Sequence, residues 1–280
     1  MAGGAKRSNA VDMSMATIAV VVLFLLPAPL WFVAWVSFSG ESFLRLPPRE
    51  YSLRWYVEFL SSAMWMYALG VSVVLGAVVA LVTTATALFA ALAAERMRSA
   101  SRGWFELLIL LPLLFPAAAM AIAMRAVNTQ LDINATFLGV MIAHVIICGP
   151  FAYRPIAVNL RALDPGTREA AMSLGASPSY TLWKIILPQL KPGLITSLWF
   201  SFIISFDEVN VTMFLVGTQF TTLPVQTYAR LADAGDPIVA AISVFLIVIT
   251  VLLVVVLQRL VGLKMLVNSE ARVNELKGGN

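Results

Sequence analysis

Long runs of hydrophobic residues alternate along this chain with shorter polar stretches. Six of the runs are near the ~20 residues that an α-helix needs to cross a bilayer. They cover residues 15–38, 66–93, 104–124, 137–160, 194–216 and 237–260. Composition agrees, because 60% of the 280 residues are hydrophobic and 12% are charged, whereas a soluble domain carries about 25% charge. The sequence therefore predicts an all-α membrane protein with six transmembrane helices.

The predicted spans define three parts of the chain: an N-terminal segment (1–14), a transmembrane domain (15–263) and a tail (264–280). The first run could instead be a signal peptide, but it is longer than the ~7–15 apolar residues typical of one, so we expect an uncleaved helix. The third run contains Pro112 and Pro116. A helix bundle tolerates prolines, so we expect that run to be a single span.

Basic residues indicate the orientation of the spans. Six spans put both termini on one side of the membrane, and cytoplasmic loops carry an excess of Lys and Arg. With the termini inside, 14 of the 19 Lys and Arg residues are cytoplasmic. The five outside are Arg45, Arg49, Arg54, Arg125 and Arg230. This bias predicts cytoplasmic termini and a cytoplasmic loop at residues 161–192.

The 161–192 loop is polar but strongly patterned. Asp164-Pro165 and Ser177-Pro178 both place a capping side chain before a proline, which is a helix-start signal. Gly175 lies where a glycine would end the first helix with a left-handed residue. The loop therefore predicts two short helices joined at Gly175. An amphipathic connector that only covers lipid headgroups would show the same caps.

The residues of this loop also match a family motif. The positions that carry the match are Glu169, Ala170, Ala171, Gly175, Ile185, Leu187 and Pro188. This pattern resembles the EAA loop of type I ABC importer permeases, which docks into a groove on the ATPase subunit. The resemblance implies that these seven residues form an ATPase-docking site and that the loop lies between the fourth and fifth transmembrane helices.

Two adjacent acidic residues, Asp207 and Glu208, fall inside the fifth predicted span. A charge facing lipid costs ~2.5–3.5 kcal/mol or more, so both should face the bundle interior, a partner subunit or water. Asp207 is expected ~20 Å along a ~30 Å hydrocarbon core, in the outer half. They could line a path for a cationic substrate, or they could form an ion pair or a cap at a broken helix, for example with Arg125 or Arg154.

A second resemblance concerns the substrate. It rests on Ser205-Phe206-Asp207-Glu208-Val209, Leu223-Pro224 and Tyr228. This segment is similar to the shorter permease subunit of spermidine/putrescine importers, with Glu208 where that pattern has a second Asp. The resemblance covers nearly the whole chain, and it implies Asp207 and Glu208 as pathway residues for a polyamine. Another organic solute, of the amino acid or phosphonate type, is the alternative.

The family resemblance implies the partners as well. They are a homologous permease subunit, two ATPase subunits that bind ATP and Mg²⁺, an extracytoplasmic solute-binding protein and the bilayer of the bacterial inner membrane. The sequence contains no Gly-rich loop ending in Gly-Lys-Ser/Thr, so we expect no ATPase activity, catalytic residue or cofactor in this chain. An ion-coupled secondary transporter is a rival of another class, and a signalling membrane protein is a further one.

Two other residues are predicted to be structural. His144 stands alone in the fourth predicted span and is expected to form hydrogen bonds between helices rather than relay protons. Cys148 is the single cysteine and lies in an apolar run, so it is expected to be a packing residue.

Overall fold

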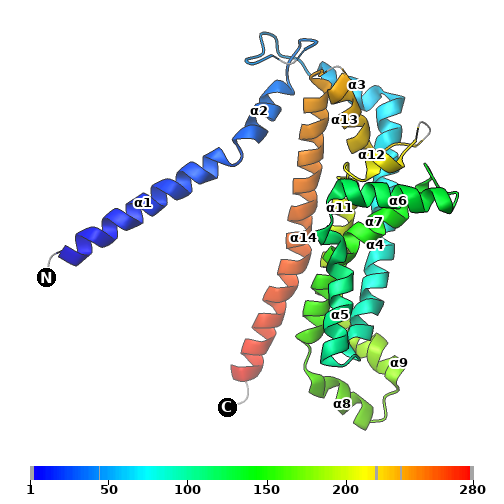
Figure 1. Cartoon of the computed structure of the whole chain (residues 1–280). Coiled ribbons are helices and arrows are strands. Elements are labelled where there is room, and N and C mark those ends of the chain that lie inside the picture. Colours follow the sequence, from blue (N-terminus) through cyan, green and yellow to red (C-terminus); the bar gives the residue numbers. More distant parts are fainter. Residues whose placement is uncertain (1–2, 44, 218–219, 234, 278–280) are drawn as a thin grey trace. The chain divides into compact units, whose positions relative to one another are not determined.

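The computed structural model describes residues 3–43, 45–217, 220–233 and 235–277, and these residues are mostly helical (Figure 1). The chain divides into two compact units. The first contains Met1–Ser62 and Ala229–Val248, and the second contains Ala63–Tyr228 and Ile249–Asn280. The predicted helical class is confirmed.

The first unit contains α1 (Gly3–Leu25), α2 (Ala28–Val36), α3 (Arg54–Ser61) and the start of α14 (Ile238–Lys277). The apolar stretch Met15–Val36 is long enough to cross a membrane despite the break at Pro27. Aromatic side chains contact one another within this unit. Phe59 packs edge-on against Phe245 at 5.1 Å between ring centroids, and Trp35 Nε1 donates to the Tyr51 hydroxyl at 2.9 Å.

Three helices form the core of the second unit: α4 (Ala63–Glu95), α7 (Phe137–Arg161) and α11 (Lys191–Phe206), each in contact with the other two. Small residues let them approach closely. A Cβ on Gly193 would lie 2.9 Å from the Pro155 carbonyl oxygen, and one on Gly76 would lie 3.1 Å from the Phe202 ring. The buried Thr84 and Ser197 hydroxyls are hydrogen-bonded at 3.1 Å between α4 and α11.

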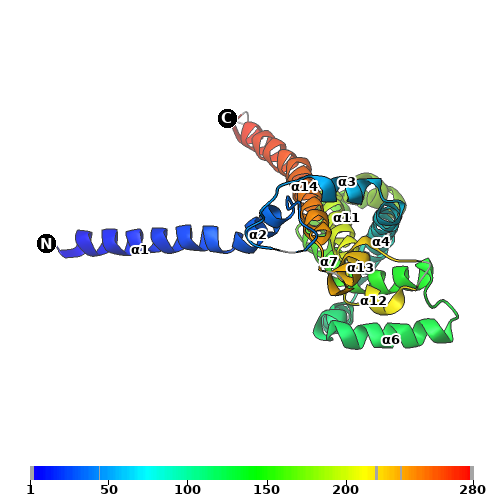
Figure 2. The same cartoon turned by 90° about the horizontal axis from the view of Figure 1, so that it is seen from above.

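The third predicted span is not a single helix. It forms α5 (Ser99–Leu110), a 3₁₀ turn η1 (Leu111–Leu114) and α6 (Ala117–Gln130), with a bend of 104°. Figures 1 and 2 show α6 running across the direction of α5. Phe115 is extended, with φ −90° and ψ 139°, as favoured for a residue before a proline such as Pro116. The run with Pro112 and Pro116 is therefore a bent pair of helices rather than one continuous helix.

The fifth predicted span is also interrupted. α11 ends at Phe206, and the helix resumes only as the short α12 (Thr212–Leu215) before α13 (Leu223–Asp233). By length and composition, the described residues contain four helices able to cross a membrane, or five if the α5–α6 pair counts as one span. At 16 residues, α11 is a shorter apolar helix. The predicted apolar segments are thus largely helical, but the first, third and fifth are broken.

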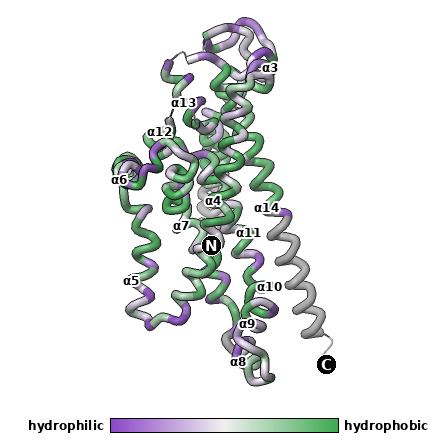
Figure 3. The backbone as a smooth tube through the Cα atoms, turned by 90° about the vertical axis from the view of Figure 1, so that its right-hand side faces the viewer, coloured by the Kyte–Doolittle hydropathy of each residue, from purple (hydrophilic) through white to green (hydrophobic). Residues whose placement is uncertain are grey.

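The loop between α7 and α11 folds into short helical pieces. They are α8 (Pro165–Ser173), α9 (Pro178–Thr181), a π-helix η2 (Leu182–Ile186) and α10 (Leu187–Gln189). Figure 3 shows hydrophilic residues around α8 to α10 and at the start of α5, and hydrophobic ones along α4 and α7. At the chain's other end, α14 continues to Lys277 through most of the predicted tail, whose residues 278–280 lie outside the described part.

Candidate functional site

The corner of the 161–192 loop forms as its residues predict. The Asp164 carboxylate accepts a hydrogen bond from the Gly166 N–H at 2.9 Å and caps α8. Gly175 has φ 86°, in the left-handed region. The Gly175 N–H donates to the Met172 carbonyl and the Ala176 N–H donates to the Ala171 carbonyl, both at 3.0 Å. This paired arrangement is a Schellman motif, which satisfies the last carbonyls of α8.

The second half of the loop differs from the single short helix that was expected. The Ser177 hydroxyl caps α9 by accepting from the Tyr180 N–H at 3.2 Å. The helix then widens into the π-turn of η2 before Pro188, which has no N–H to continue an α-helical ladder. Pro188 lies inside α10, and Pro192 lies in the first turn of α11.

The predicted docking residues are partly exposed on this loop. Glu169, Ala170, Gly175 and Pro188 are exposed, whereas Ala171, Ile185 and Leu187 are half-buried. Large apolar side chains lie close to them along the loop. Leu174 is 89% exposed, and Trp183, Tyr180 and Met172 are exposed as well. Clustered apolar side chains in a polar loop are typical of a surface that binds a partner.

A cleft of about 470 Å³ opens beneath α8. Charged residues of both signs line it, namely Glu95, Arg161, Asp164, Arg168 and Glu169. Glu169 therefore shares this cleft with Arg161, the last residue of α7. The cleft joins the loop to the ends of α4 and α7.

The predicted pathway acids lie at the break between α11 and α12. Asp207 follows the last residue of α11 and is exposed, and Glu208 is half-buried. Glu208 Oε1 accepts a hydrogen bond from the Val211 N–H at 2.8 Å. Glu208 thus bonds to the turn that precedes α12, which agrees with the helix-break alternative left open by the sequence. The Asp207 carboxylate has no hydrogen bond or ion pair among the described residues.

Neither acid forms an ion pair with the arginines considered in the sequence analysis. Among the described residues, the ion pairs are Arg102–Glu106, Arg161–Glu106 and Arg230–Asp236. Arg125 instead donates from Nη1 to the Phe214 carbonyl at 2.7 Å, which ties α6 to α12. The break therefore carries two carboxylates with no cationic partner in the described chain.

His144 holds the two sides of this break together. Its Nδ1 is 2.8 Å from the Ser205 hydroxyl at the end of α11, and its Nε2 is 2.8 Å from the Thr212 hydroxyl at the start of α12. The predicted helix-to-helix role of His144 is confirmed. Cys148 is fully buried one turn further along α7, with Sγ 3.5 Å from the Ser201 carbonyl, in agreement with a packing role.

Residues 85–266 match the family of binding-protein-dependent transport system inner membrane components. The chain belongs to this family. It is a permease subunit of an ABC importer in the inner membrane, as the EAA-type loop predicted. The bent α5–α6 pair and the broken α11–α12 segment therefore belong to a permease fold.

Relatives of this permease include proteins named for two kinds of substrate. PhnV of Salmonella typhimurium, named for a 2-aminoethylphosphonate transport system, is 28% identical over 88% of this chain and 92% of its own. PotC of Haemophilus influenzae, a spermidine/putrescine transport system permease protein, is 28% identical over 85% and 92%. PotI of Escherichia coli K12, a putrescine transport system permease protein, is 27% identical over 81% and 85%.

Solved ABC transporters share the fold of this permease. A bacterial alginate transporter in complex with its alginate pentasaccharide-bound periplasmic protein superposes with a TM-score of 0.72, at 15% identity, over 91% of this chain and 94% of that one. A second alginate importer structure gives a TM-score of 0.66 at 20% identity, over 90% and 97%. At these identities the likeness establishes the architecture alone.

Proposed function

We propose that this permease forms half of the pathway of an importer for a small organic cation, a polyamine of the spermidine or putrescine kind. The observation that carries this proposal is the pair Asp207 and Glu208 at the α11–α12 break, without a cationic partner in the described chain. Two carboxylates within a membrane segment attract ammonium groups strongly and disfavour anions. The relatives PotC and PotI, named for polyamine transport, support this substrate class.

The second candidate substrate is an aminophosphonate, as the name of PhnV suggests. Such a molecule carries an ammonium group for Asp207 and a phosphonate that needs a cation. Arg125 supplies one near this break, because it is bound to Phe214 of α12. The two substrates therefore make different demands on the same site, and Arg125 should matter only for the second.

The rest of the assembly follows from the 161–192 loop. Glu169, Ala170, Ala171, Gly175, Ile185, Leu187 and Pro188 form the ATPase-docking surface in this proposal. The exposed side chains of Leu174 and Trp183 support it, because both lose contact with water if an ATPase covers the loop from α8 to η2. The loop and both termini are cytoplasmic, and two ATPase subunits bind ATP and Mg²⁺. A homologous permease completes the pathway, and an external binding protein delivers the solute.

Transport proceeds by alternating access in this scheme. Closure of the ATPases on ATP moves the docking loop, and the pathway opens outward to receive solute from the binding protein. This chain contributes positioning and charge rather than hydrolysis. Asp207 binds the ammonium group, while the hydrogen bond from Val211 to Glu208 keeps the broken helix open at the site.

The test is uptake by an importer that carries Asp207→Asn and Glu208→Gln together. Loss of a charge contact of ~1.4 kcal/mol lowers apparent affinity about tenfold, so putrescine and spermidine uptake should fall while complex yield and basal ATP hydrolysis are kept. Glu58→Gln, which neutralises an exposed acid on α3, is the matched control and should transport normally.

Each other outcome of this test reassigns the site. Normal uptake of every cation by the double variant defeats the pathway role of the two acids. A low yield of assembled complex assigns them to folding instead. Uptake of 2-aminoethylphosphonate that depends on Arg125, tested with Arg125→Gln, would replace the polyamine by the aminophosphonate.

A further inference from the structure

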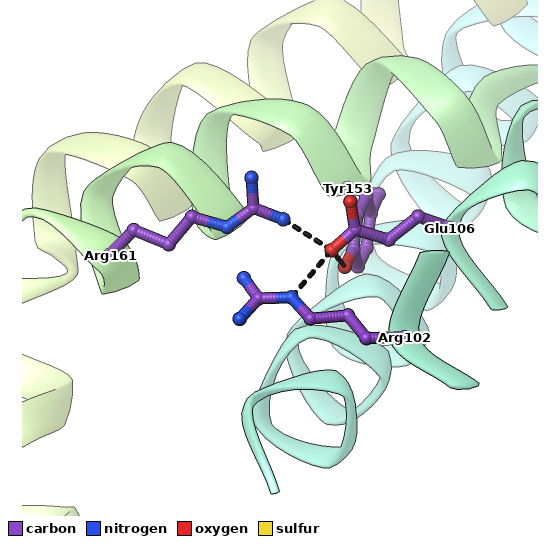
Figure 4. Close-up of polar contacts among 4 residues, drawn as sticks. All are labelled: Arg102, Glu106, Tyr153 and Arg161. Atoms are coloured by element: carbon purple, nitrogen blue, oxygen red, sulfur yellow. Dashed lines mark hydrogen bonds and ion pairs between the residues drawn. The ribbon is translucent and has the colours of Figure 1, made fainter. Parts of the chain in front are cut away.

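Glu106 of α5 is the centre of a polar network that the sequence did not reveal. Its Oε1 accepts hydrogen bonds from Arg102 Nε at 2.9 Å, from the Tyr153 hydroxyl at 3.2 Å and from Arg161 Nη2. Figure 4 shows both guanidinium groups converging on this carboxylate, with the Tyr153 ring beside it. One oxygen thus joins three side chains from two helices.

The network lies at the point where α7 becomes the docking loop. Arg161 is the last residue of α7, and Asp164, three residues later, caps α8. Arg161 also lines the cleft that contains Glu169. Any displacement of α8 therefore acts on Arg161, whose guanidinium is held by α5.

Apolar contacts hold the same two helices in register. Tyr153 is 4% exposed and belongs to a buried cluster with Ile156 and Leu160 of α7. Phe105 and Ile109 of α5 pack against this cluster on either side of Glu106. The polar network is therefore fixed by packing on its inner side, while Arg102 and Arg161 remain partly open to solvent.

The far end of α5 leads towards the break between α11 and α12, where Asp207 and Glu208 lie. The chain bends by 104° into α6, and Arg125 of α6 donates to the Phe214 carbonyl of α12. α12 begins four residues after Glu208. All of these elements belong to the second unit, so backbone and side-chain links together connect α8 through Arg161, Glu106 and α6 to α12.

We propose that Glu106 and Arg161 are positioning residues that transmit movement of the docking loop to the α5–α6 pair, and through it to the substrate pathway. This inference rests on the proposed docking of the ATPase at residues 161–192. A purely structural staple is the competing explanation. Partly exposed ion pairs contribute little to global stability, so loss of this one should affect coupling more than folding. Removal of the Glu106 carboxylate also leaves Arg102 and Arg161 without the group that holds them together.

The experiment uses the assembled importer with Glu106→Gln, Arg161→Gln and the double variant. Each complex is measured for ATPase recovery, thermal stability, basal ATP hydrolysis and hydrolysis stimulated by the loaded binding protein. Arg98→Gln is the matched control, because this exposed arginine precedes α5 and is not part of the Glu106 network. Glu106→Asp, which keeps the charge, tests for partial rescue.

We expect full ATPase recovery, unchanged thermal stability and basal hydrolysis within about twofold of wild type. Stimulation and uptake should fall about tenfold, within the usual range of coupling between sites. Because both residues act through one contact, the double variant should be no worse than either single variant. Arg98→Gln should behave as wild type, and Glu106→Asp should restore part of the stimulation.

Three results overturn the inference. Wild-type stimulation in Glu106→Gln and Arg161→Gln shows that the network carries no coupling. Additive losses in the double variant show that the two residues act separately. Parallel loss of complex yield and thermal stability assigns the network to folding. A different result tests the proposed function itself. If no loaded binding protein stimulates the wild-type complex, the proposed function is wrong, and this inference is wrong with it.

Discussion

Gly175 forms the corner between α8 and α9 with φ 86°, a conformation that L side chains rarely adopt. A Cβ added at this position meets no heavy atom within 4 Å, so the β-carbon of a new side chain introduces no steric clash. The effect of Gly175→Ala therefore comes from the backbone. Gly175→Ala thus changes the shape of the docking corner without changing the packing of the spans.

The expected cost follows from that geometry. A non-glycine L residue in the left-handed region costs roughly 1–2 kcal/mol, Asn is better tolerated and a β-branched residue is worse. One to two kcal/mol corresponds to about a 5–30-fold shift in a conformational equilibrium. Gly175→Asn, Gly175→Ala and Gly175→Val should therefore weaken ATPase binding in that order, with Gly175→Ala about 5–30-fold weaker than wild type.

The assay is titration of the ATPase subunit onto purified permease complexes, together with a pull-down. Gly235→Ala is the matched control, because Gly235 also has a positive φ, 61°, and open space around it, but lies between α13 and α14. This control should bind the ATPase normally. Equal ATPase affinity in wild type and Gly175→Val would refute the docking assignment, and so would an equal loss in Gly235→Ala.

Two further predictions concern packing and orientation. Gly193→Ala should destabilise the detergent-solubilised complex by about 1–3 kcal/mol of free energy and lower its melting temperature, because the new Cβ meets the Pro155 carbonyl oxygen at 2.9 Å. Gly149→Ala, with nothing within 4 Å, should be neutral, and equal melting of the two variants would contradict the close approach of α7 and α11. In a background that lacks Cys148, a cysteine in place of Ser42 should react with an impermeant thiol reagent in intact cells, whereas one in place of Ser99 should react only after permeabilisation. The reverse pattern would invert the predicted topology.

Local signals were read correctly from the sequence. The caps at Asp164 and Ser177 and the positive φ of Gly175 each depend on a few neighbouring residues, so their chemistry is visible in the chain itself. The apolar segments were found for the same reason, since hydropathy over about 20 residues decides membrane insertion. The family then followed from the loop motif.

The breaks in the spans could not be decided in the same way. Pro150 and Pro155 lie inside the continuous α7, whereas Pro112 and Pro116 flank a 104° bend. Proline alone therefore does not fix the outcome, because neighbouring helices can satisfy the carbonyls that it leaves free.

Contacts between distant residues were hidden from the sequence for a related reason. Glu106 meets Arg161 across 55 positions, and no local pattern links the two residues. His144 was expected to bond to another helix, but only the folded chain places it between Ser205 and Thr212. The sequence thus located the docking loop and the acids, while the connection between them required the structure.

The central claim is that this chain is a permease that couples ATP hydrolysis to import of an organic cation. The most direct measurement is ATP hydrolysis and uptake by the purified importer in proteoliposomes, with binding protein loaded in turn with putrescine, spermidine, 2-aminoethylphosphonate and an amino acid. The account predicts stimulated hydrolysis and uptake with a polyamine, and loss of both in the Asp207→Asn, Glu208→Gln variant. Stimulation by the other solutes alone, or equal activity in that variant, would contradict it.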